Sequence, residues 1–281
     1  MEASFDRYGD PTRPTSPVIL SVPHAGRDYP PAILPLIRTT PSALRALEDR
    51  HVDLVALAAR GARTAFVQRS PRAWIDLNRG EDERDPLVDE GADPTRQPHR
   101  SAKLRSGLGL VPRRVPGAGE IWRGKLSDRD VSARIEQAHR PYHRALSAAL
   151  MAARARFGIA VLLDLHSMPP LEGGAAQVVL GDRFGRAAAA RFVSRAESVA
   201  LAAGLRVALN SPYAGGHILD RHACPMRDVH GIQLEVDRAL YLDARLEGPG
   251  EGLAGTAALV ASVLAALEDE ALSAALPLAA E

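Results

Sequence analysis

The sequence predicts a single α/β domain over residues 1–281, built on a central mixed, mainly parallel sheet with helices on both faces. Short apolar runs that end at Pro, Gly or Ser alternate along the chain with longer segments of helical periodicity. Such runs are typical of strands buried on both faces, and their alternation with helices is typical of a parallel sheet. A chain of 281 residues, 46% of them hydrophobic, is long enough for one large core.

The first part of the chain supplies three predicted strands and a helical region. Residues 1–16 are polar and rich in proline, so we expect a loose leader before the strand at 17–22. Hydroxyl side chains and apolar residues at helical spacing predict one helix or two between residues 42 and 61. Apolar and aromatic runs predict the next strands at 64–67 and 73–77.

Residues 81–127 show no regular pattern. They are rich in Asp, Pro, Gly and Arg, and the stretch is too long for an ordinary connection. Because it is too polar for a core, we expect an inserted polar flap that closes over the site. From Ser127 onward, Ser-Asp-Arg-Asp is typical of a helix cap and predicts a helix to about residue 156.

The second half continues the alternation without an internal repeat. The predicted elements are a strand ending at His166, a strand at 175–180, a helix at 183–203, strands at 206–209 and 231–236, and a helix at 252–268.

Composition favours a small-molecule substrate over a macromolecular partner. The 35 basic and 34 acidic side chains are interspersed and leave a net charge of +1, so we expect neither nucleic acid nor a membrane surface as partner. The first residues lack the order of a signal peptide and no run of about 18 apolar residues occurs, which predicts a cytoplasmic protein. One cysteine, Cys224, excludes an internal disulfide. Nothing in these patterns specifies an oligomeric state.

Two predicted strands each end in a histidine, His24 and His166. Ligands of open α/β sheets bind beyond the carboxyl ends of the strands, and imidazole nitrogen is a preferred ligand of zinc. The pair therefore suggests a metal site. The alternative is two buried histidines that only form hydrogen bonds.

Asn78 and Arg79 directly follow a predicted strand and have the chemistry of a carboxylate clamp. Arginine binds a planar carboxylate through two parallel charged hydrogen bonds, and the neighbouring amide adds a donor. Arg72 begins the same strand, about 20 Å away if the chain is extended and closer if it bends, and could hold a second anion or a developing oxyanion. The alternative is a set of surface ion pairs.

The alternation in residues 229–236 places Gln233 and Glu235 on one strand face. Burial raises the pKa of an unpaired carboxyl, as a general base near neutrality requires, so Glu235 is the predicted catalytic base. The alternative is a structural salt bridge to Arg238 or another arginine.

A third metal ligand is expected among Glu48, Asp49, His51 and Asp53. On one continuous helix His51 shares the apolar face and Asp49 points away, which favours His51. Asp49 gains if it caps a new helix, since its carboxylate could then turn toward the ion. We choose Asp49 and keep the others as alternatives.

Two further features carry weaker signals. His143 lies on a predicted helix, where a packing histidine is the simpler interpretation. Gly215 and Gly216 precede His217 and would let the backbone approach a substrate closely, although a plain turn is the alternative.

Taken together, these motifs resemble the N-formylglutamate amidohydrolase family, and the resemblance spans most of the chain. It implies a fold related to zinc carboxypeptidases and aspartoacylases, and hydrolysis of N-formyl-L-glutamate to formate and glutamate at the end of histidine degradation. The motifs are Ser21–Gly26, Asp49–Asp53, Pro71–Arg72 with Asp76–Arg79, Asp164–Ser167 and Gln233–Glu235.

The resemblance also implies roles for individual residues. Asn78 and Arg79 would hold a glutamate carboxylate, Arg72 would polarise the formyl oxygen, and Glu235 would be the base. Carboxypeptidases carry a glutamate ligand three residues after the first histidine, where this chain has Arg27. The carboxylate ligand must therefore come from elsewhere, which favours one zinc held by His24, Asp49 and His166. The alternatives are a zinc amidase acting on another N-acyl amino acid and a non-catalytic protein that binds small carboxylates.

Overall fold

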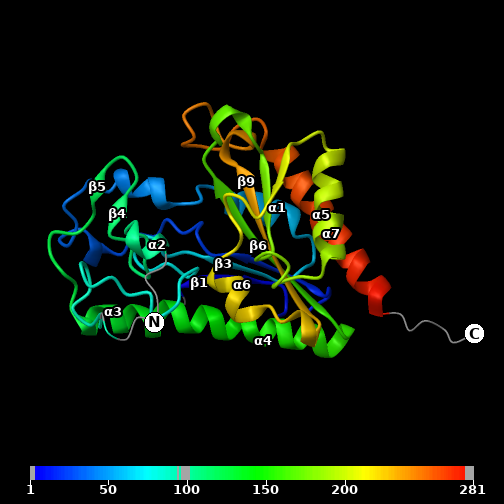
Figure 1. Ribbon diagram of the computed structural model, residues 1–281, viewed down its shortest axis with the longest axis horizontal. Coiled ribbons are helices and arrows are strands. Elements are labelled where there is room, and N and C mark those ends of the chain that lie inside the picture. Colours follow the sequence, from blue (N-terminus) through cyan, green and yellow to red (C-terminus); the bar gives the residue numbers. More distant parts are fainter. Residues whose placement is uncertain (1–3, 94, 96–101, 276–281) are drawn as a thin grey trace, which may run out of the picture. The chain divides into compact units, whose positions relative to one another are not determined.

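The computed structural model describes residues 4–93, 95 and 102–275, and these group into two compact units. Figure 1 labels the α-helices and most of the strands. Unit 1 comprises the described residues of Met1–Asp6, Pro23–Arg50 and Val67–Arg144, and unit 2 those of Arg7–Val22, His51–Phe66 and Ala145–Glu281.

A seven-stranded sheet forms the centre of unit 2, and its β1 and β3 also include residues of unit 1. β2 runs parallel to β6, and β6 runs parallel to β9, whereas β7 is antiparallel to β9. The predicted mixed, mainly parallel sheet is confirmed. Across the sheet the order is β1 (Phe5–Tyr8), β3 (Ala65–Gln68), β2 (Val18–Val22), β6 (Ala160–Met168), β9 (Val229–Asp237), β7 (Val178–Gly181) and β8 (Val207–Leu209).

Helices cover both faces of this sheet, as predicted. His230 of β9 packs against Phe192 of α5 (Ala190–Ala202), with ring centroids 4.6 Å apart. The next residue, Gly231, lies so close to α6 (His217–His222) that an added Cβ would be 2.9 Å from Leu219. Successive residues of a strand point to opposite faces, so α5 and α6 lie on opposite faces. α7 (Leu253–Ala275) packs against α5 and against α1 (Val52–Ala59).

Unit 1 contains short elements and the start of a long helix. The longest helical segment begins at α3 (Asp128–Arg134), continues through one π-helical turn, η3 (Ile135–His139), and enters α4 (Arg140–Phe157). Ser127 caps it as predicted, because its side chain accepts a hydrogen bond from Asp130 N. The remaining elements of unit 1 are η1 (Pro31–Ile33), η2 (Ala43–Leu47), α2 (Ala102–Arg105), β4 (Arg114–Val115) and β5 (Gly119–Glu120).

The expectation that residues 81–127 are too polar for a core is wrong. Scattered apolar side chains of this stretch join the buried core of unit 1, beside Ile33 and Ile75. They lack helical or strand periodicity, which is why the pattern concealed them. Residues 94 and 96–101 lie outside the described part. The core members from this stretch are Val88, Leu110, Val111, Val115, Ile121, Trp122 and Leu126.

Two further expectations about the first part of the chain need correction. Residues 73–77 form turns and not a strand, with Trp74 N bonded to Pro71 O and Asp76 N bonded to Leu110 O. Residues 1–16 are not loose throughout, since β1 lies within them and Phe5 packs edge-on against Tyr142 at 5.2 Å. Residues 1–3 of this leader lie outside the described part.

The other predicted elements appear with shifted ends. The helical region between 42 and 61 is two elements, η2 and α1, and α7 extends beyond the predicted residue 268. α5 begins at Ala190 rather than at 183, because residues 183–185 have positive φ angles that an α-helix does not allow. Three short helical turns complete unit 2: η4 (Glu172–Gly174), η5 (Pro225–Arg227) and η6 (Arg238–Leu240).

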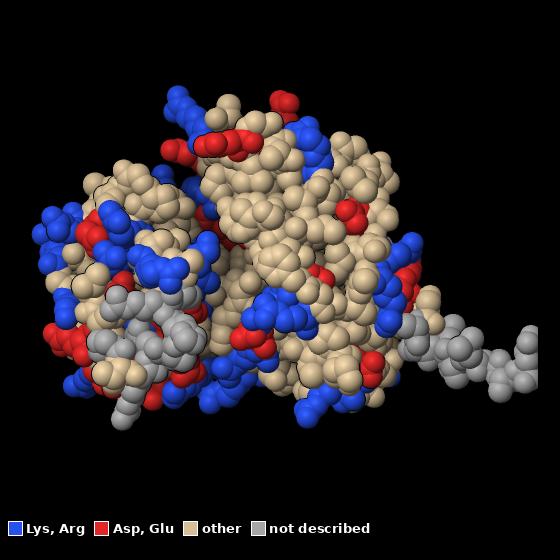
Figure 2. Space-filling view, viewed as in Figure 1, with Lys and Arg blue, Asp and Glu red and all other residues tan. Residues whose placement is uncertain are grey.

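The surface agrees with the balanced charge of the sequence. On the face drawn in Figure 2, basic and acidic side chains are interspersed and do not form a patch of one sign. Within the described ranges, no helix has the length and apolar character needed to cross a membrane.

Candidate active site

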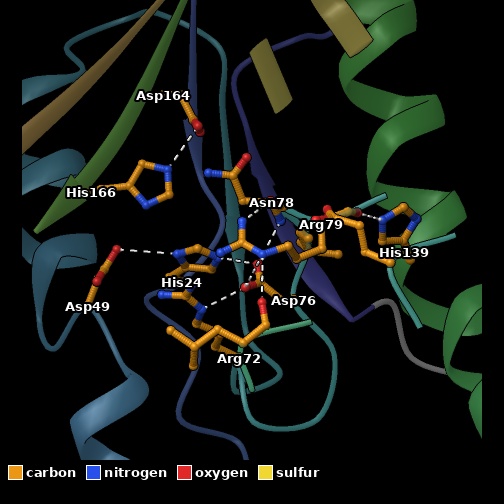
Figure 3. A network of polar contacts seen from close by, with 12 residues as sticks. His24, Asp49, Arg72, Asp76, Asn78, Arg79, His139, Asp164 and His166 are labelled. Carbon is orange, nitrogen blue, oxygen red and sulfur yellow. Dashed lines mark hydrogen bonds and ion pairs between the residues drawn. The ribbon is translucent and has the colours of Figure 1, made fainter. Parts of the chain in front are cut away.

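His24 lies two residues after the end of β2 and is buried in unit 1 between two carboxylates. Its Nε2 donates a hydrogen bond to Asp76 Oδ1 at 2.7 Å, so the Nδ1 lone pair faces Asp49 Oδ2 at 3.6 Å (Figure 3). That distance is too long for a hydrogen bond. It is close to the separation of about 3.4 Å between two ligand atoms that share one zinc ion tetrahedrally at about 2.1 Å each. The His24–Asp49 pair therefore has the chemistry and spacing of two metal ligands.

A break between two helical elements allows Asp49 to reach this position. η2 ends at Leu47 and α1 begins only at Val52, so the continuous helix that favoured His51 does not form. Asp49 N donates to His24 O at 2.9 Å, which ties the two residues together through the backbone. The neighbouring Glu48 is also buried and accepts hydrogen bonds from Tyr29 and Arg50, at 2.5 and 2.7 Å.

His51 itself stands at the N-terminus of α1 in unit 2. Its φ of 57° is left-handed, and its Nε2 lies 3.1 Å from the Glu247 carbonyl oxygen. This contact gives His51 a structural role at the start of the helix.

Asp76 is the centre of the polar network in unit 1 (Figure 3). It accepts hydrogen bonds from Arg72 Nε at 2.8 Å, from Asn78 N at 2.8 Å and from His24, and Arg79 Nε lies 3.9 Å away. Burial opposes its ionisation, but the charges of Arg72 and Arg79 and the hydrogen bond from His24 hold the pKa of this carboxyl well below its usual 3.8. Asp76 thus stays ionised and orients both arginines and the imidazole.

The turn at residues 71–79 brings Arg72 and Arg79 to one carboxylate, so these two side chains are neighbours and not 20 Å apart. Asn78 and Arg79 are buried, each 6% exposed. Arg79 donates from Nε to Leu108 O at 2.8 Å and from a terminal nitrogen to Asn78 O at 2.5 Å. Burial lowers the pKa of its guanidinium, which nevertheless remains a cation.

His166 occupies the carboxyl end of β6 in unit 2, where a second buried aspartate holds it. Its Nε2 donates to Asp164 Oδ2 at 2.8 Å, and Ser21 donates its hydroxyl to Asp164 Oδ1 at 2.8 Å. Asp164 and His166 stand two positions apart on one strand, so their side chains leave the same face. His24 and His166 are thus held alike, each with its Nε2 on a buried carboxylate. Metal-binding histidines are commonly oriented in this way.

Glu235 lies on β9 beside His166, because the two residues are register partners across the parallel β6 and β9 pair. The side chain of Glu235 is buried, and its Oε1 accepts a hydrogen bond from Gln233 at 2.8 Å. Arg238, one alternative partner for this carboxylate, donates to Ser167 Oγ at 3.2 Å.

Gly215 and Gly216 lie in the loop that leads into α6 of unit 2. Gly215 has a φ of 100°, and an added Cβ on Gly181 of β7 would lie 2.7 Å from Gly215 N. The loop therefore packs against the end of β7, and both contacting positions depend on glycine.

The sequence pattern did not reveal that Asp76 and Asp164 orient the two histidines. For Asp164 a signal exists, since Asp-x-His on a predicted strand places both side chains on one face. For Asp76 the contact depends on the irregular turn at 71–79, which the expected strand obscured.

The mixed sheet carries a buried glutamate beside one of two buried histidines, and an aspartate holds each histidine, an arrangement typical of hydrolases that use a metal. Comparison with known families agrees, because the family model of N-formylglutamate amidohydrolase matches residues 16–242. The chain belongs to the N-formylglutamate amidohydrolase family.

The similarity to relatives and to solved structures extends over most of the chain. This chain is 27% identical over 235 residues to an N-formylglutamate deformylase of Pseudomonas aeruginosa. It is 30% identical over 239 residues to an N-formylglutamate deformylase of Pseudomonas putida. Each match covers 81% of this chain and 82% of the relative. The crystal structure of N-formylglutamate amidohydrolase from Ralstonia eutropha has a TM-score of 0.88 and 31% identity, covering 97% of this chain and all of that one. A protein from Agrobacterium tumefaciens, 19% identical with a TM-score of 0.69, shares the fold and covers 97% of this chain and 96% of its own.

Proposed function

We propose that this protein is a metal-dependent amidohydrolase that cleaves N-formyl-L-glutamate to formate and L-glutamate. The observation that carries the proposal is the family match over residues 16–242, which includes every residue assigned a role below. Two relatives covered over four fifths of their length are named N-formylglutamate deformylase. In this proposal the enzyme acts in the cytoplasm at the end of histidine degradation, on a free amino-acid derivative.

His24, Asp49 and His166 would hold one divalent ion, with zinc as the best match to two imidazoles and one carboxylate. Their donor chemistry supports this set: an aspartate orients each histidine through Nε2, and Asp49 faces the Nδ1 atom of His24. When bound, such an ion supplies Lewis acidity, which polarises a carbonyl and lowers the pKa of water.

Glu235 would accept the proton of the attacking water and return it to the departing amine. Water oxygen then bonds to the formyl carbon and the carbon–nitrogen bond breaks, so the products are formate and the free amino group of glutamate. Gln233 supports this role, since its amide holds one carboxylate oxygen and fixes the side chain.

The arginines and the amide of unit 1 would bind the substrate's anionic groups. Arg72 would stabilise the developing oxyanion, while Asn78 and Arg79 would bind a carboxylate. Asp76 supports both roles by holding Arg72 and Arg79 close together. Gly215 and Gly216 would let the main chain of their loop lie close against the substrate.

The test is release of formate from N-formyl-L-glutamate, measured with and without a chelator and compared with N-acetylated amino acids. We expect release from the formyl substrate that stops on chelation and returns with zinc. Preferred cleavage of an acetylated substrate would indicate an amidase for another acyl group. Glutamate binding that is insensitive to chelator, without any cleavage, would indicate a non-catalytic carboxylate-binding protein.

A further inference from the structure

We infer that His139 and His143 are positioning residues that hold the backbone of Asn78 and Arg79 in a shape able to bind a carboxylate. The inference builds on the proposed function, because that function makes Asn78 and Arg79 the carboxylate clamp. Both histidines are fully buried, and they lie one helical turn apart at the junction of η3 and α4.

His139 contacts a backbone carbonyl of the clamp, and His143 contacts the carbonyl of the residue just before it. His139 Nε2 lies 2.8 Å from Arg79 O (Figure 3). His143 Nε2 lies 3.0 Å from Leu77 O. A carbonyl oxygen only accepts hydrogen bonds, so both rings must carry a proton on Nε2. The carbonyl between them, Asn78 O, accepts from the Arg79 guanidinium at 2.5 Å. Three consecutive carbonyls are therefore fixed, and the two histidines fix the outer ones.

The clamp needs these partners because it lies in an irregular segment. Residues 71–79 form turns, so their buried carbonyls have no sheet or helix ladder to satisfy them. Side chains of the α3, η3 and α4 segment contact three carbonyls of the turn, those of Trp74, Leu77 and Arg79. Besides the two histidines, Arg134 donates to Trp74 O at 3.0 Å. Just beyond the turn, Arg140 binds the Glu81 carboxylate at 2.8 Å.

The π-helical turn explains how one helix face can deliver these donors. Arg140 N bonds to Ile135 O, five residues back, and Pro141 follows with no N–H to continue the ordinary pattern. In a regular α-helix Arg134 and His139, five positions apart, would point about 140° away from each other. The extra residue in the π turn removes most of that rotation, so Arg134, His139 and His143 all reach the segment.

The rings of His139 and His143 also support each other. Their centroids are 4.3 Å apart, and the His143 ring packs edge-on against Tyr142 at 6.1 Å. This packing restricts both imidazoles and keeps each Nε2 aimed at its carbonyl.

Replacing each histidine by asparagine and by glutamine tests whether the hydrogen-bond donor must lie at the position of Nε2, or whether any polar side chain suffices. The side-chain nitrogen of glutamine reaches the place of Nε2, whereas that of asparagine stops near Nδ1. We would compare His143→Asn with His143→Gln and His139→Asn with His139→Gln, using Arg144→Gln on the exposed side of the same helix as a control. Measurements are the Kd of L-glutamate by calorimetry, KM and kcat for N-formyl-L-glutamate, and bound metal.

Both Asn variants should bind L-glutamate about tenfold more weakly and raise KM by a similar factor, with kcat changed by less than about threefold. The Gln variants should recover most of the loss, and Arg144→Gln should behave as wild type. Asn variants that fold and bind glutamate normally would overturn the inference. So would Gln variants no better than Asn, or a loss of metal instead of glutamate affinity.

Wild-type turnover keeps the two proposals distinguishable. One outcome is a wild type that releases no formate but binds glutamate, while the Asn variants bind glutamate more weakly than the Gln variants. In that case the proposed function fails and the positioning role stands. If the wild type releases formate but binds no glutamate, the positioning role is overturned.

Discussion

His166 and Glu235 are register partners on adjacent parallel strands, and both side chains leave the same face of the sheet. Neighbouring strands lie about 4.8 Å apart, so the imidazole and the carboxylate are adjacent by construction. Both residues are buried, and each is held by a polar neighbour two positions earlier on its own strand, Asp164 and Gln233. This pairing places the proposed metal ligand His166 directly beside the proposed base Glu235.

Glu235→Gln should bind metal normally but lower kcat by about 10²–10⁴-fold, because the amide cannot accept the proton of water. The side chain keeps its size, and its oxygen can still accept the hydrogen bond from Gln233. Formate release and metal content of the same sample provide the measurement. Turnover within a few-fold of wild type would remove Glu235 as the base.

Asp76→Asn should lower the free energy of unfolding by about 3–5 kcal/mol, because it leaves Arg72 and Arg79 without the buried charge that they share. It should also weaken metal and glutamate binding, since Asp76 orients His24 as well as both arginines. Urea unfolding, together with metal and glutamate titrations, measures these effects.

A matched control is Asp89→Asn. Asp89 is another buried aspartate of unit 1, and it accepts hydrogen bonds from Arg84. The substitution should also lower stability, but glutamate affinity should stay as in the wild type. Equal losses of glutamate affinity in the two variants would mean that Asp76 acts only through stability.

Gly26→Ala should destabilise the loop that carries His24, because an added Cβ would lie 2.0 Å from Ser70 O and 2.5 Å from Arg69 O. Backbone atoms cannot move aside cheaply, so we expect a loss of about 1–3 kcal/mol or more, with weaker metal binding. Gly255→Ala is the control, since its Cβ would enter open space in α7 and should be neutral or stabilising. Thermal unfolding of both variants decides this; an unchanged Tm for Gly26→Ala would contradict the close packing.

Much of the sheet was predictable from the sequence because buried strands and alternating helices leave a periodic signal. His24, His166 and Glu235 could be placed by the ends and alternation of those strands. The core of unit 1 could not, since Val88, Leu110 and their neighbours are scattered through a polar stretch.

Long-range contacts in irregular segments limit how much of the site can be predicted from the sequence. The turn at 71–79 depends on donors from a helix about 60 residues further along the chain, and no local pattern specifies such contacts. The break after η2 that frees Asp49 was likewise one of two possibilities that periodicity left open.

Stability should fall as the pH drops from about 6.5 to about 4, in part because of His230. Burial lowers the pKa of this imidazole from 6.5 to about 4, and its Nδ1 accepts a hydrogen bond from Ala189 N at 3.3 Å. Below pH 6.5 the unfolded chain takes up a proton that the folded chain refuses until about pH 4, so unfolding is favoured across this window.

The loss of stability caused by His230 is absent above about pH 7, grows as the pH falls, and is complete below about pH 4. His230→Phe removes the titrating group and keeps a ring against Phe192. Urea unfolding across pH 4–8 should therefore show a gentler decline for the variant. Parallel curves for the two proteins would contradict the low pKa of His230.

The most direct test of the central claim is formate release from N-formyl-L-glutamate by metal-free protein to which zinc is added back. Activity should rise linearly and level off at one zinc ion per chain, while His166→Ala and His24→Ala should bind no stoichiometric zinc and release no formate. Full activity of the metal-free protein, or normal zinc binding by both histidine variants, would contradict it.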